Sequence, residues 1–266
     1  MAGELEPLLA LAVRLAREAG AIQRERYETA FAIASKSQPI DLVTEVDHAC
    51  EAHVVGALAR ERPDDAVLAE EGRGEDLRHA RFRWVIDPLD GTTNFAHGYP
   101  RFAVSIGVER DGEPALGVVY DPLLDELYHA VAAGGAFRNG RPIRVSQESE
   151  FSRALLATGF AYDKAVSAED NLAEFGAALK AARELRRDGS AALDLCYVAS
   201  GRLDGYWEHK LKPWDVAAGG LLVREAGGRV SDRTGGDAWR SGRALVATNG
   251  RIHAALLALL AAAGAR

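Results

Sequence analysis

The chain has 266 residues, of which 48% are hydrophobic and 27% are charged, a balance typical of a globular protein with a substantial core. Its formal net charge of -7 does not favour nucleic acid as a partner, because an acidic chain gains nothing from displacing the counterions of DNA or RNA. Two cysteines without CxxC spacing argue against a disulfide framework and a zinc site. We find no secretory signal and no apolar run of membrane length, and we expect a cytoplasmic protein.

The first third of the chain predicts two helices followed by two short strands. Leucine and alanine recur at helical spacing over residues 4–26. Thr44 is expected to cap a second helix that stops before Pro63. Residues 65–72 and 82–87 read as strands that carry acidic side chains at their ends. The predicted apolar face of the second helix consists of Val46, Cys50, His53, Val54 and Leu58.

The middle of the chain changes pattern. Strands are predicted near residues 103–109, 115–120 and 126–131, and the segments "RDGE" and "DPLLD" between them have the composition of hairpin turns. Consecutive strands joined by such turns form an antiparallel meander, so a doubly wound parallel sheet is not expected.

The second half alternates between helices and strands. We expect helices at 168–182, at 191–201 and at 214–228, the last capped by Asp215, and a strand at 203–209. Two further strands and a C-terminal helix follow. The basic run "RELRRDG" (183–189) is a candidate for a local basic patch, but a solvated helix end before a glycine is the favoured interpretation. The pattern as a whole predicts an α+β protein with alternating layers.

Acidic side chains recur where predicted strands end and helices begin. A carboxylate in such a place is positioned to face a shared site, whereas one on a helix face usually points into water. The acids in such places are Asp41, Asp47, Glu70, Glu71, Asp87, Asp90 and Asp215.

The stretch "WVIDPLDGTTNF" (84–95) carries the sharpest pair of acids. Asp87 is expected to end an apolar strand, and Gly91 permits a tight turn after Asp90. Thr92 can then open a helix with free amide donors. Carboxylate oxygens suit Mg²⁺, and the donors suit a phosphate, so the stretch indicates phosphoryl chemistry. The plain structural alternative is that Asp90 is a helix N-cap.

With these motifs the chain resembles the inositol monophosphatase family of Mg²⁺-dependent, lithium-sensitive phosphatases. "WVIDPLDGTTNF" and "WDVAAGGLLVREAGG" match the two signatures of the family, and "DLVTEVD", "AEE" and "GSAALDLCYVASG" match further blocks in the right order. The resemblance extends from about residue 5 to residue 260, and two long signatures at the correct separation are a specific signal. One departure is Ala69, where many members have glycine.

The resemblance implies a fold and an assembly. It implies an α+β, layered α-β-α-β-α sandwich of the sugar phosphatase type with a large antiparallel sheet. It also implies one domain over residues 1–266, with an α+β half at about 1–145 and an α/β half at about 146–266. Members of the family are typically homodimers, so a homodimer is expected.

The resemblance also implies a cofactor of two to three Mg²⁺ ions. One ion would be bound by Glu70, Asp87 and the backbone carbonyl of Leu89. A second would be bound by Asp87, Asp90 and Asp215, and a third, weaker one by Glu70 and waters. An aspartate that bridges two ions gives the close metal pair used for in-line displacement at phosphorus.

The catalytic residues implied by the resemblance are Glu70, Thr92 and Asp47. A water activated by the first ion would attack the phosphate, oriented by Glu70 and Thr92. Asp47 would pair with the Thr92 hydroxyl and accept a relayed proton, and the amides of Gly91 and Thr92 would bind phosphate oxygens.

Contacts to substrate hydroxyls would come from Asp90, Ser190, Ala191 and Glu208. A carboxylate at position 208 can accept hydrogen bonds from a vicinal diol, although an exposed strand-end glutamate is the alternative.

Two basic residues are further candidates. Lys36 could steady a water or the phosphate, and a plain loop lysine is the alternative. Arg187, next to Arg186, could reach a second anionic group of a substrate.

The expected function is therefore hydrolysis of inositol monophosphate, a small phosphorylated polyol. One alternative is another small phosphate: histidinol phosphate, fructose 1,6-bisphosphate, an adenosine 3′-phosphate or NADP. A second, from another class, is a binding partner of the transcription machinery, because some bacterial proteins similar to this one work in that way. Neither that role nor a nucleic-acid partner is favoured, and no membrane partner is expected.

Overall fold

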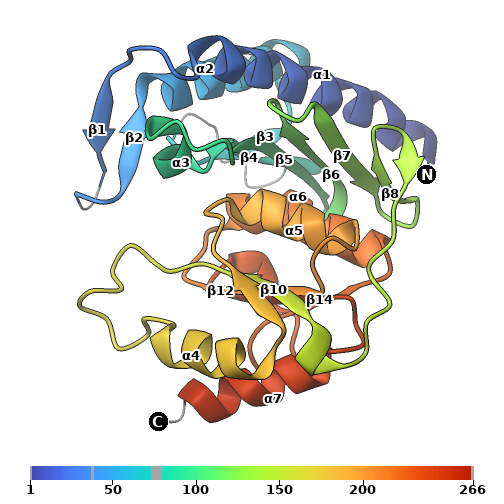
Figure 1. Cartoon of the computed structure of the whole chain (residues 1–266). Coiled ribbons are helices and arrows are strands. Elements are labelled where there is room, and N and C mark those ends of the chain that lie inside the picture. Colours follow the sequence, from blue (N-terminus) through green and yellow to red (C-terminus); the bar gives the residue numbers. More distant parts are fainter. Residues whose placement is uncertain (1, 37–38, 73–79, 265–266) are drawn as a thin grey trace.

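The structure is a computed structural model that describes residues 2–36, 39–72 and 80–264. Its elements form five layers, helix–sheet–helix–sheet–helix, as Figure 1 shows from top to bottom. This arrangement confirms the predicted layered α+β fold. The layers of helices are α1 (Ala2–Arg26) with α2 (Glu45–Glu61), α5 (Ala191–Ala199) with α6 (Pro213–Glu225), and α4 (Leu172–Ala181) with α7 (His253–Gly264).

The larger sheet has seven strands in the order β3-β4-β5-β6-β7-β8-β9 within the described residues. β3 and β4 pair in parallel, and every later neighbour pairs antiparallel, which confirms the predicted meander. Its strands are β3 (Ala66–Ala69), β4 (Phe82–Asp90), β5 (Ala103–Arg110), β6 (Glu113–Asp121), β7 (Glu126–Val131), β8 (Gly135–Arg138) and β9 (Arg141–Pro142).

The smaller sheet has the order β11-β10-β12-β14-β13, and a separate hairpin pairs β1 with β2. Strand β10 was not predicted from the sequence, and the prediction for "RELRRDG" was wrong, because residues 184–186 form edge strand β11 and not a helix end. The remaining strands are β1 (Ile33–Ser35), β2 (Leu42–Thr44), β10 (Leu155–Thr158), β11 (Glu184–Arg186), β12 (Gly205–His209), β13 (Arg229–Ser231) and β14 (Ala244–Thr248).

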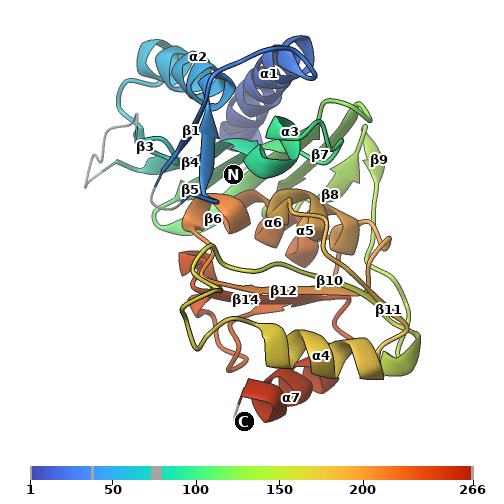
Figure 2. The ribbon, with the colours of Figure 1, turned by 60° about the vertical axis from the view of Figure 1, so that its left-hand side comes forward.

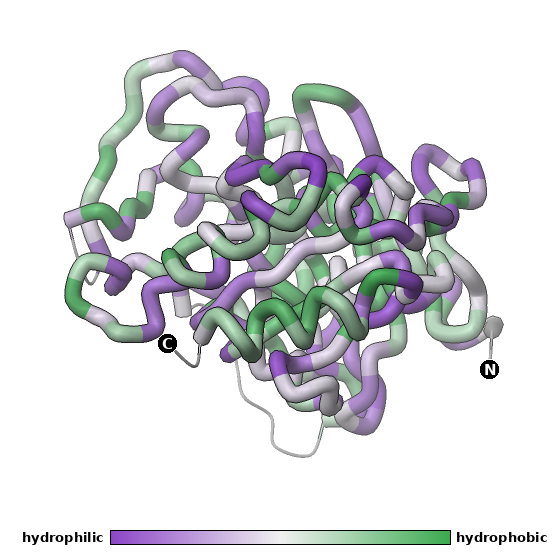
Figure 3. The backbone as a smooth tube through the Cα atoms, turned by 60° about the horizontal axis from the view of Figure 1, so that its bottom comes forward, coloured by the Kyte–Doolittle hydropathy of each residue, from purple (hydrophilic) through white to green (hydrophobic). Residues whose placement is uncertain are grey.

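Each interface between layers has its own apolar core. Alternation along the strands sends Trp84 and Ile86 of β4 toward α1 and α2, whereas Ala103 of β5 faces the central helices. A third cluster joins the smaller sheet to α4 and α7. α7 appears green along most of its length in Figure 3, because alanine and leucine dominate its sequence. No helix among the described residues is long and apolar enough to cross a membrane.

The helices agree with the expectations at one cap and differ from them in several details. Thr44 caps α2 as predicted, accepting from the amides of Val46 and Asp47. His53, however, does not belong to the apolar face of α2, because its ring is half exposed and contacts Glu18 at 2.8 Å. α4 begins only at Leu172. Asp215 is not the cap of α6 but its third residue.

The central helix α6 packs against the larger sheet at two glycines. A Cβ atom on Gly107 would lie 2.7 Å from the Cβ of Ala217, and one on Gly117 would lie 2.7 Å from the carbonyl oxygen of Ala218. Real side chains do not tolerate such contacts, so glycine at both positions lets the helix approach the sheet closely. The first turn of α6, which carries Asp215, is thereby held close to β4.

Candidate active site

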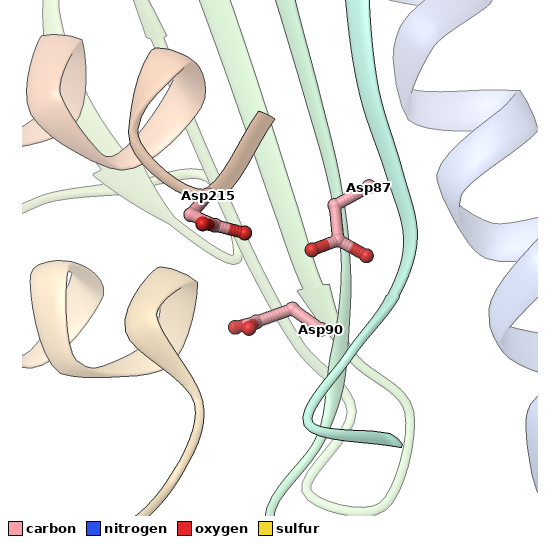
Figure 4. Close-up of side chains that lie close together, drawn as sticks. All are labelled: Asp87, Asp90 and Asp215. Carbon is pink, nitrogen blue, oxygen red and sulfur yellow. The ribbon is translucent and has the colours of Figure 1, made fainter. Parts of the chain in front are cut away.

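Three carboxylates converge between the larger sheet and α6. Asp87 and Asp90 extend from β4 and Asp215 extends from the first turn of α6, and the three side chains point toward one another in Figure 4. Each offers an oxygen within 4.8 Å of the others. The structure thus brings together acids that lie more than a hundred residues apart in the sequence.

The end of β4 differs from its prediction. Asp87 does not end the strand, which continues to Asp90 with a shift in register between the two acids. Such a bulge turns the side chains of the strand, here so that both acids face α6. Gly91 then caps the short helix α3 (Thr92–Ala96) with a left-handed φ of 101°. A Cβ there would lie 2.7 Å from the carbonyl oxygen of Arg101, so glycine is required.

Asp90 is not the N-cap of α3, because its carboxylate is bound elsewhere. Oδ2 of Asp90 accepts a hydrogen bond of 2.5 Å from the Ser190 hydroxyl and one of 2.8 Å from the Ala192 amide. Ser190 is itself the N-cap of α5, and Ala191 is the first residue of that helix. The structure therefore brings Asp90, Ser190 and Ala191 together.

Crowding of the acids raises their pKa values. Burial raises the pKa of Asp87 well above its ordinary range, and repulsion by Glu70, Asp90 and Asp215 adds to it. Burial and the charges of Asp90 and Glu70 likewise raise the pKa of Asp215 well above its ordinary range. Burial also raises the pKa of Asp90, against the opposing hydrogen bonds from Ser190 and Ala192. A cluster of this kind is stabilised by a cation that compensates the carboxylate charges.

Asp47 and Thr92 form a second, adjoining pair. The Thr92 hydroxyl lies 2.8 Å from Oδ1 of Asp47 and 3.1 Å from the carbonyl oxygen of Leu89. The other oxygen of Asp47 accepts from the hydroxyl of Thr44 at 2.5 Å and from its amide at 2.8 Å. Asp47 is fully buried, and burial raises its pKa, opposed by these hydrogen bonds.

Glu70 lies just beyond β3 and interacts with Lys36. The ammonium group of Lys36 donates to Oε1 of Glu70 at 2.7 Å and to Oε1 of Glu71 at 2.5 Å. Burial raises the pKa of Glu70 to about 6, although the charge of Lys36 lowers it. The carboxylates of Glu70 and Asp87 interact directly, so Glu70 adjoins the three aspartates. Lys36 therefore binds a proposed catalytic residue, rather than projecting freely from a loop.

Glu208 lies on β12 beside Gly159. A Cβ on Gly159 would lie 2.0 Å from Oε2 of Glu208, so the backbone of residue 159 rests directly on this carboxylate. The Tyr206 hydroxyl donates to Oε2 of Glu208 at 2.5 Å, and burial raises the pKa of Glu208 to about 7. The charges of Arg187 and Lys164 act in the opposite direction, so both cations lie near Glu208.

Two residues near the site were missed by the sequence analysis. The Asn94 side-chain amide donates to the carbonyl oxygens of Arg101 and Asp188, both at 2.7 Å, and so ties α3 to the segment that carries Ser190. The hydroxyl of Tyr162 is influenced by the charges of Glu70, Asp90 and Asp215. Asn94 belongs to the stretch "WVIDPLDGTTNF", but nothing in that stretch indicates its bond to the carbonyl of Asp188, and no local motif marks Tyr162.

Comparisons with known proteins agree with this geometry. The model of the inositol monophosphatase family matches residues 4–265. "Inositol-1-monophosphatase" of Synechocystis is 44% identical over 259 residues, covering 97% of this chain and 90% of that protein. "Nus factor SuhB" of Escherichia coli K12 is 44% identical over 255 residues, and the match covers 96% of this chain and 96% of that protein.

Solved structures agree with these relatives. The inositol monophosphatase from Anabaena superposes with a TM-score of 0.88 at 43% identity, covering 98% of this chain and 97% of the other. The "extragenic suppressor protein suhB" from Bartonella henselae superposes with a TM-score of 0.91 at 37% identity, covering 96% and 98%.

Proposed function

The chain belongs to the inositol monophosphatase family, and from this premise we propose that it is a Mg²⁺-dependent phosphomonoesterase that hydrolyses inositol monophosphate to inositol and phosphate. The observation that carries the proposal is the convergence of Asp87, Asp90 and Asp215. Membership of this family supports a phosphatase. We propose in addition that the cation is Mg²⁺ and that the substrate is inositol monophosphate.

The donor set fits Mg²⁺. The three aspartates supply hard carboxylate oxygens and no nitrogen or sulfur, which is the preference of Mg²⁺. We propose that Glu70 and the Leu89 carbonyl complete a site for two to three ions. When bound, Mg²⁺ would supply positive charge to the phosphate oxygens and make water a better nucleophile.

Asp47 and Thr92 are proposed to position the attacking water. If the Thr92 hydroxyl donates its proton to Asp47, its lone pairs are free to accept a proton from water. Asp47 can accept the relayed proton because burial already favours its neutral form. Glu70, whose pKa is raised to about 6, is proposed to accept from the same water.

The chain also offers groups for the phosphate and for the substrate hydroxyls. The amides of Gly91 and Thr92 begin α3 and therefore have no partner within that helix, so we assign them to phosphate oxygens. Asp90, with Ser190 and Ala191 beside it, and Glu208 are assigned to the hydroxyls of the polyol.

A panel of substrates tests the proposal. Phosphate release would be measured with inositol 1-phosphate, glycerol 2-phosphate, histidinol phosphate, fructose 1,6-bisphosphate, NADP and adenosine 3′,5′-bisphosphate. We expect the highest kcat/KM for inositol 1-phosphate, loss of release with EDTA and recovery with excess Mg²⁺. Preference for another member of the panel would move the assignment to that substrate, and release unaffected by EDTA would refute the metal proposal.

A second candidate function follows from the relatives named Nus factor SuhB, which are as similar to this chain as the named phosphatase. We propose an additional association with the transcription machinery on a surface separate from the carboxylates. Co-purification of RNA polymerase with the wild-type chain and equally with Asp87→Asn would support it. Absence of polymerase from both preparations would refute it.

We also propose a homodimer, on the basis of family membership. Sedimentation equilibrium at micromolar concentration should give twice the chain mass of 28.5 kDa. A single species at the chain mass would contradict this assembly.

A further inference from the structure

Gln23 is a polar side chain of α1 that reaches the larger sheet at the bulge of β4, and it is fully buried. Its amide nitrogen donates to the carbonyl oxygen of Pro88 on β4 at 2.8 Å and, less closely, to that of Ala103 on β5 at 3.4 Å. Carbonyl oxygens only accept hydrogen bonds, so the nitrogen of the Gln23 amide, and not its oxygen, must face them. Gln23 thus connects α1 to both strands at the bulge.

The bulge explains why a buried donor is needed at this point. Between Asp87 and Asp90, β4 advances by three residues while its partner strand β5 advances by two. The extra residue takes backbone groups of β4 out of the regular ladder of hydrogen bonds. A buried carbonyl without a donor is costly, and Gln23 supplies the Pro88 carbonyl with a donor from the helix.

The same peptide group also holds the carboxylate of Asp87. The amide of Leu89 donates to Oδ1 of Asp87 at 3.0 Å. The Pro88 carbonyl and the Leu89 amide belong to one planar peptide bond, so they can rotate only together. Gln23 binds this peptide at its carbonyl and Asp87 binds it at its amide, which couples the orientation of the Asp87 side chain to α1.

The next carbonyl of the bulge faces a different partner. The carbonyl oxygen of Leu89 lies 3.1 Å from the hydroxyl of Thr92, which also contacts Asp47. α1 covers one face of the larger sheet and α6 covers the other in both views of the ribbon (Figures 1 and 2). Gln23 therefore fixes the bulge from the face of the sheet opposite to the one that Asp87 shares with α6.

We propose that Gln23 is a positioning residue of the carboxylate site. By holding the peptide between Pro88 and Leu89, it orients the Asp87 carboxylate and the Leu89 carbonyl for the cation. This inference rests on the proposed function and extends it to a residue outside the carboxylate cluster. Loss of the Gln23 hydrogen bond should weaken binding of the cation, with little effect on binding of the phosphate ester once the cation is bound.

Calorimetric titration of the full-length protein with MgCl₂ tests the inference without substrate. Gln23→Met keeps the length of the side chain but has no donor, and the Kd for Mg²⁺ should rise about tenfold. Gln23→Glu places a carboxylate oxygen against the Pro88 carbonyl and should weaken binding at least as much.

Asn249→Leu is the matched control for a lost buried amide. The Asn249 side chain is buried and donates to the Ser146 hydroxyl and the Glu148 carbonyl, both at 2.8 Å, outside the carboxylate cluster. This variant should keep the wild-type Kd for Mg²⁺ even though it loses hydrogen bonds. The comparison separates the role of Gln23 in orientation from a general loss of stability.

Kinetics with inositol 1-phosphate give a second readout. In Gln23→Met, the Mg²⁺ concentration for half-maximal activity should rise about tenfold, whereas KM at saturating Mg²⁺ should change less than about twofold. A wild-type Kd for Mg²⁺ in Gln23→Met, or an equal increase in Asn249→Leu, would overturn the inference while leaving the phosphatase intact. Absence of phosphate release by the wild-type protein from every substrate would instead refute the proposed function.

Hydrogen exchange of the Leu89 amide keeps the inference testable if circular dichroism shows that the Gln23 variants fail to fold. In the wild-type protein without added cation, NMR should show this amide exchanging at least about a hundredfold more slowly than in an unfolded chain. The reason is that the Leu89 amide donates to Asp87 within a peptide that Gln23 holds. Exchange at the rate of an unfolded chain would overturn the inference.

Discussion

The hydroxyl of Ser190 donates a 2.5 Å hydrogen bond to the carboxylate of Asp90, and this bond joins the larger sheet to helix α5. Asp90 also accepts a hydrogen bond from the Ala192 amide, which is one of the first-turn donors that an N-cap side chain normally satisfies. The proposed metal site and the start of α5 are for this reason one structural unit.

Ser190→Ala should weaken both stability and activity. The variant loses a hydrogen bond to a carboxylate and the cap of α5, which together cost about 1–2 kcal/mol of unfolding free energy. We also expect kcat/KM to fall about tenfold, because Asp90 is then held by one bond fewer. Urea unfolding and steady-state kinetics measure the two effects. Ser200→Ala, which removes a hydroxyl at the other end of α5, is the control, and equal behaviour of the two variants would contradict the coupling.

Asp87→Asn and Asp215→Asn should each lower turnover by about two orders of magnitude or more, because each removes a charged oxygen ligand. The fold should persist, since asparagine preserves the shape and relieves the repulsion that raises the pKa of both acids. Phosphate release at saturating Mg²⁺ is the measurement. Asp64→Asn, an exposed carboxylate on the surface, is the control. Near-normal turnover of either site variant would refute the assignment of metal ligands.

Lys36→Met should lower the Mg²⁺ concentration required for half-maximal activity. Lys36 binds Glu70 at 2.7 Å, so a cation that needs this carboxylate must compete with the ammonium group. For a partly exposed ion pair, the expected change is about two- to fivefold. Titration of activity with Mg²⁺ shows the effect, with Lys180→Met as the control. A higher requirement for Mg²⁺ would mean that Lys36 assists the site instead of competing for it.

Lithium should inhibit the enzyme at millimolar concentration, as expected of the family named above. A small monovalent cation can replace Mg²⁺ among carboxylate oxygens but supplies less charge to the phosphate. Phosphate release in LiCl, compared with equal KCl to hold ionic strength constant, measures this. Unchanged turnover in LiCl would place the chain among divergent members of the family.

His253 should make the protein less stable in mild acid. Its Nδ1 lies 2.9 Å from the Thr248 hydroxyl and its Nε2 lies 2.9 Å from the Ser231 hydroxyl. Because Ser231 donates to the carbonyl of Asp232, Nε2 must donate to Ser231, and Nδ1 accepts from Thr248. The neutral ring satisfies this network, whereas a second proton on Nδ1 would face the hydroxyl proton of Thr248.

Burial lowers the pKa of His253 to about 4, against an ordinary value of 6.5. The unfolded chain therefore binds a proton as the pH falls through 6.5, and the folded chain does so only near 4. The contribution of neutral His253 to the free energy of unfolding should be fully present above pH 6.5, and it should fall by about 2–3 kcal/mol as the pH drops from 6.5 to about 4. Urea unfolding from pH 7 to pH 4 should show a smaller loss for His253→Gln, while His48→Gln, at an exposed position, should behave as the wild type. Identical slopes for wild type and His253→Gln would contradict the prediction.

Much of the site could be predicted from local sequence, because one segment carries its central part. Asp87, Asp90, Gly91 and Thr92 lie within six residues, and the constraints on them are those of a strand, a turn and a helix start. Contacts between distant segments could not be predicted in the same way. The bond between Asp90 and Ser190 depends on how the two halves of the chain pack, and the register shift in β4 depends on its pairing with β5.

Short edge elements were also beyond prediction. β11 has three residues and no periodic pattern, so only pairing with β10 distinguishes it from a helix end. His53 was assigned to an apolar face from spacing alone, but Glu18 on the neighbouring helix α1 offers it a partner near the surface. In each case the missing information was the identity of a neighbour in space.

The close packing of α6 at Gly107 and Gly117 has an evolutionary consequence. The spacing between Asp215 and the aspartates of β4 depends on two positions that carry no side chain and lie outside the carboxylate cluster. Drift toward alanine there would push the helix outward and enlarge the gap between carboxylates, even in a chain whose chemical groups were all retained. Relatives that keep every acid yet lack activity could be recognised by side chains at these two positions.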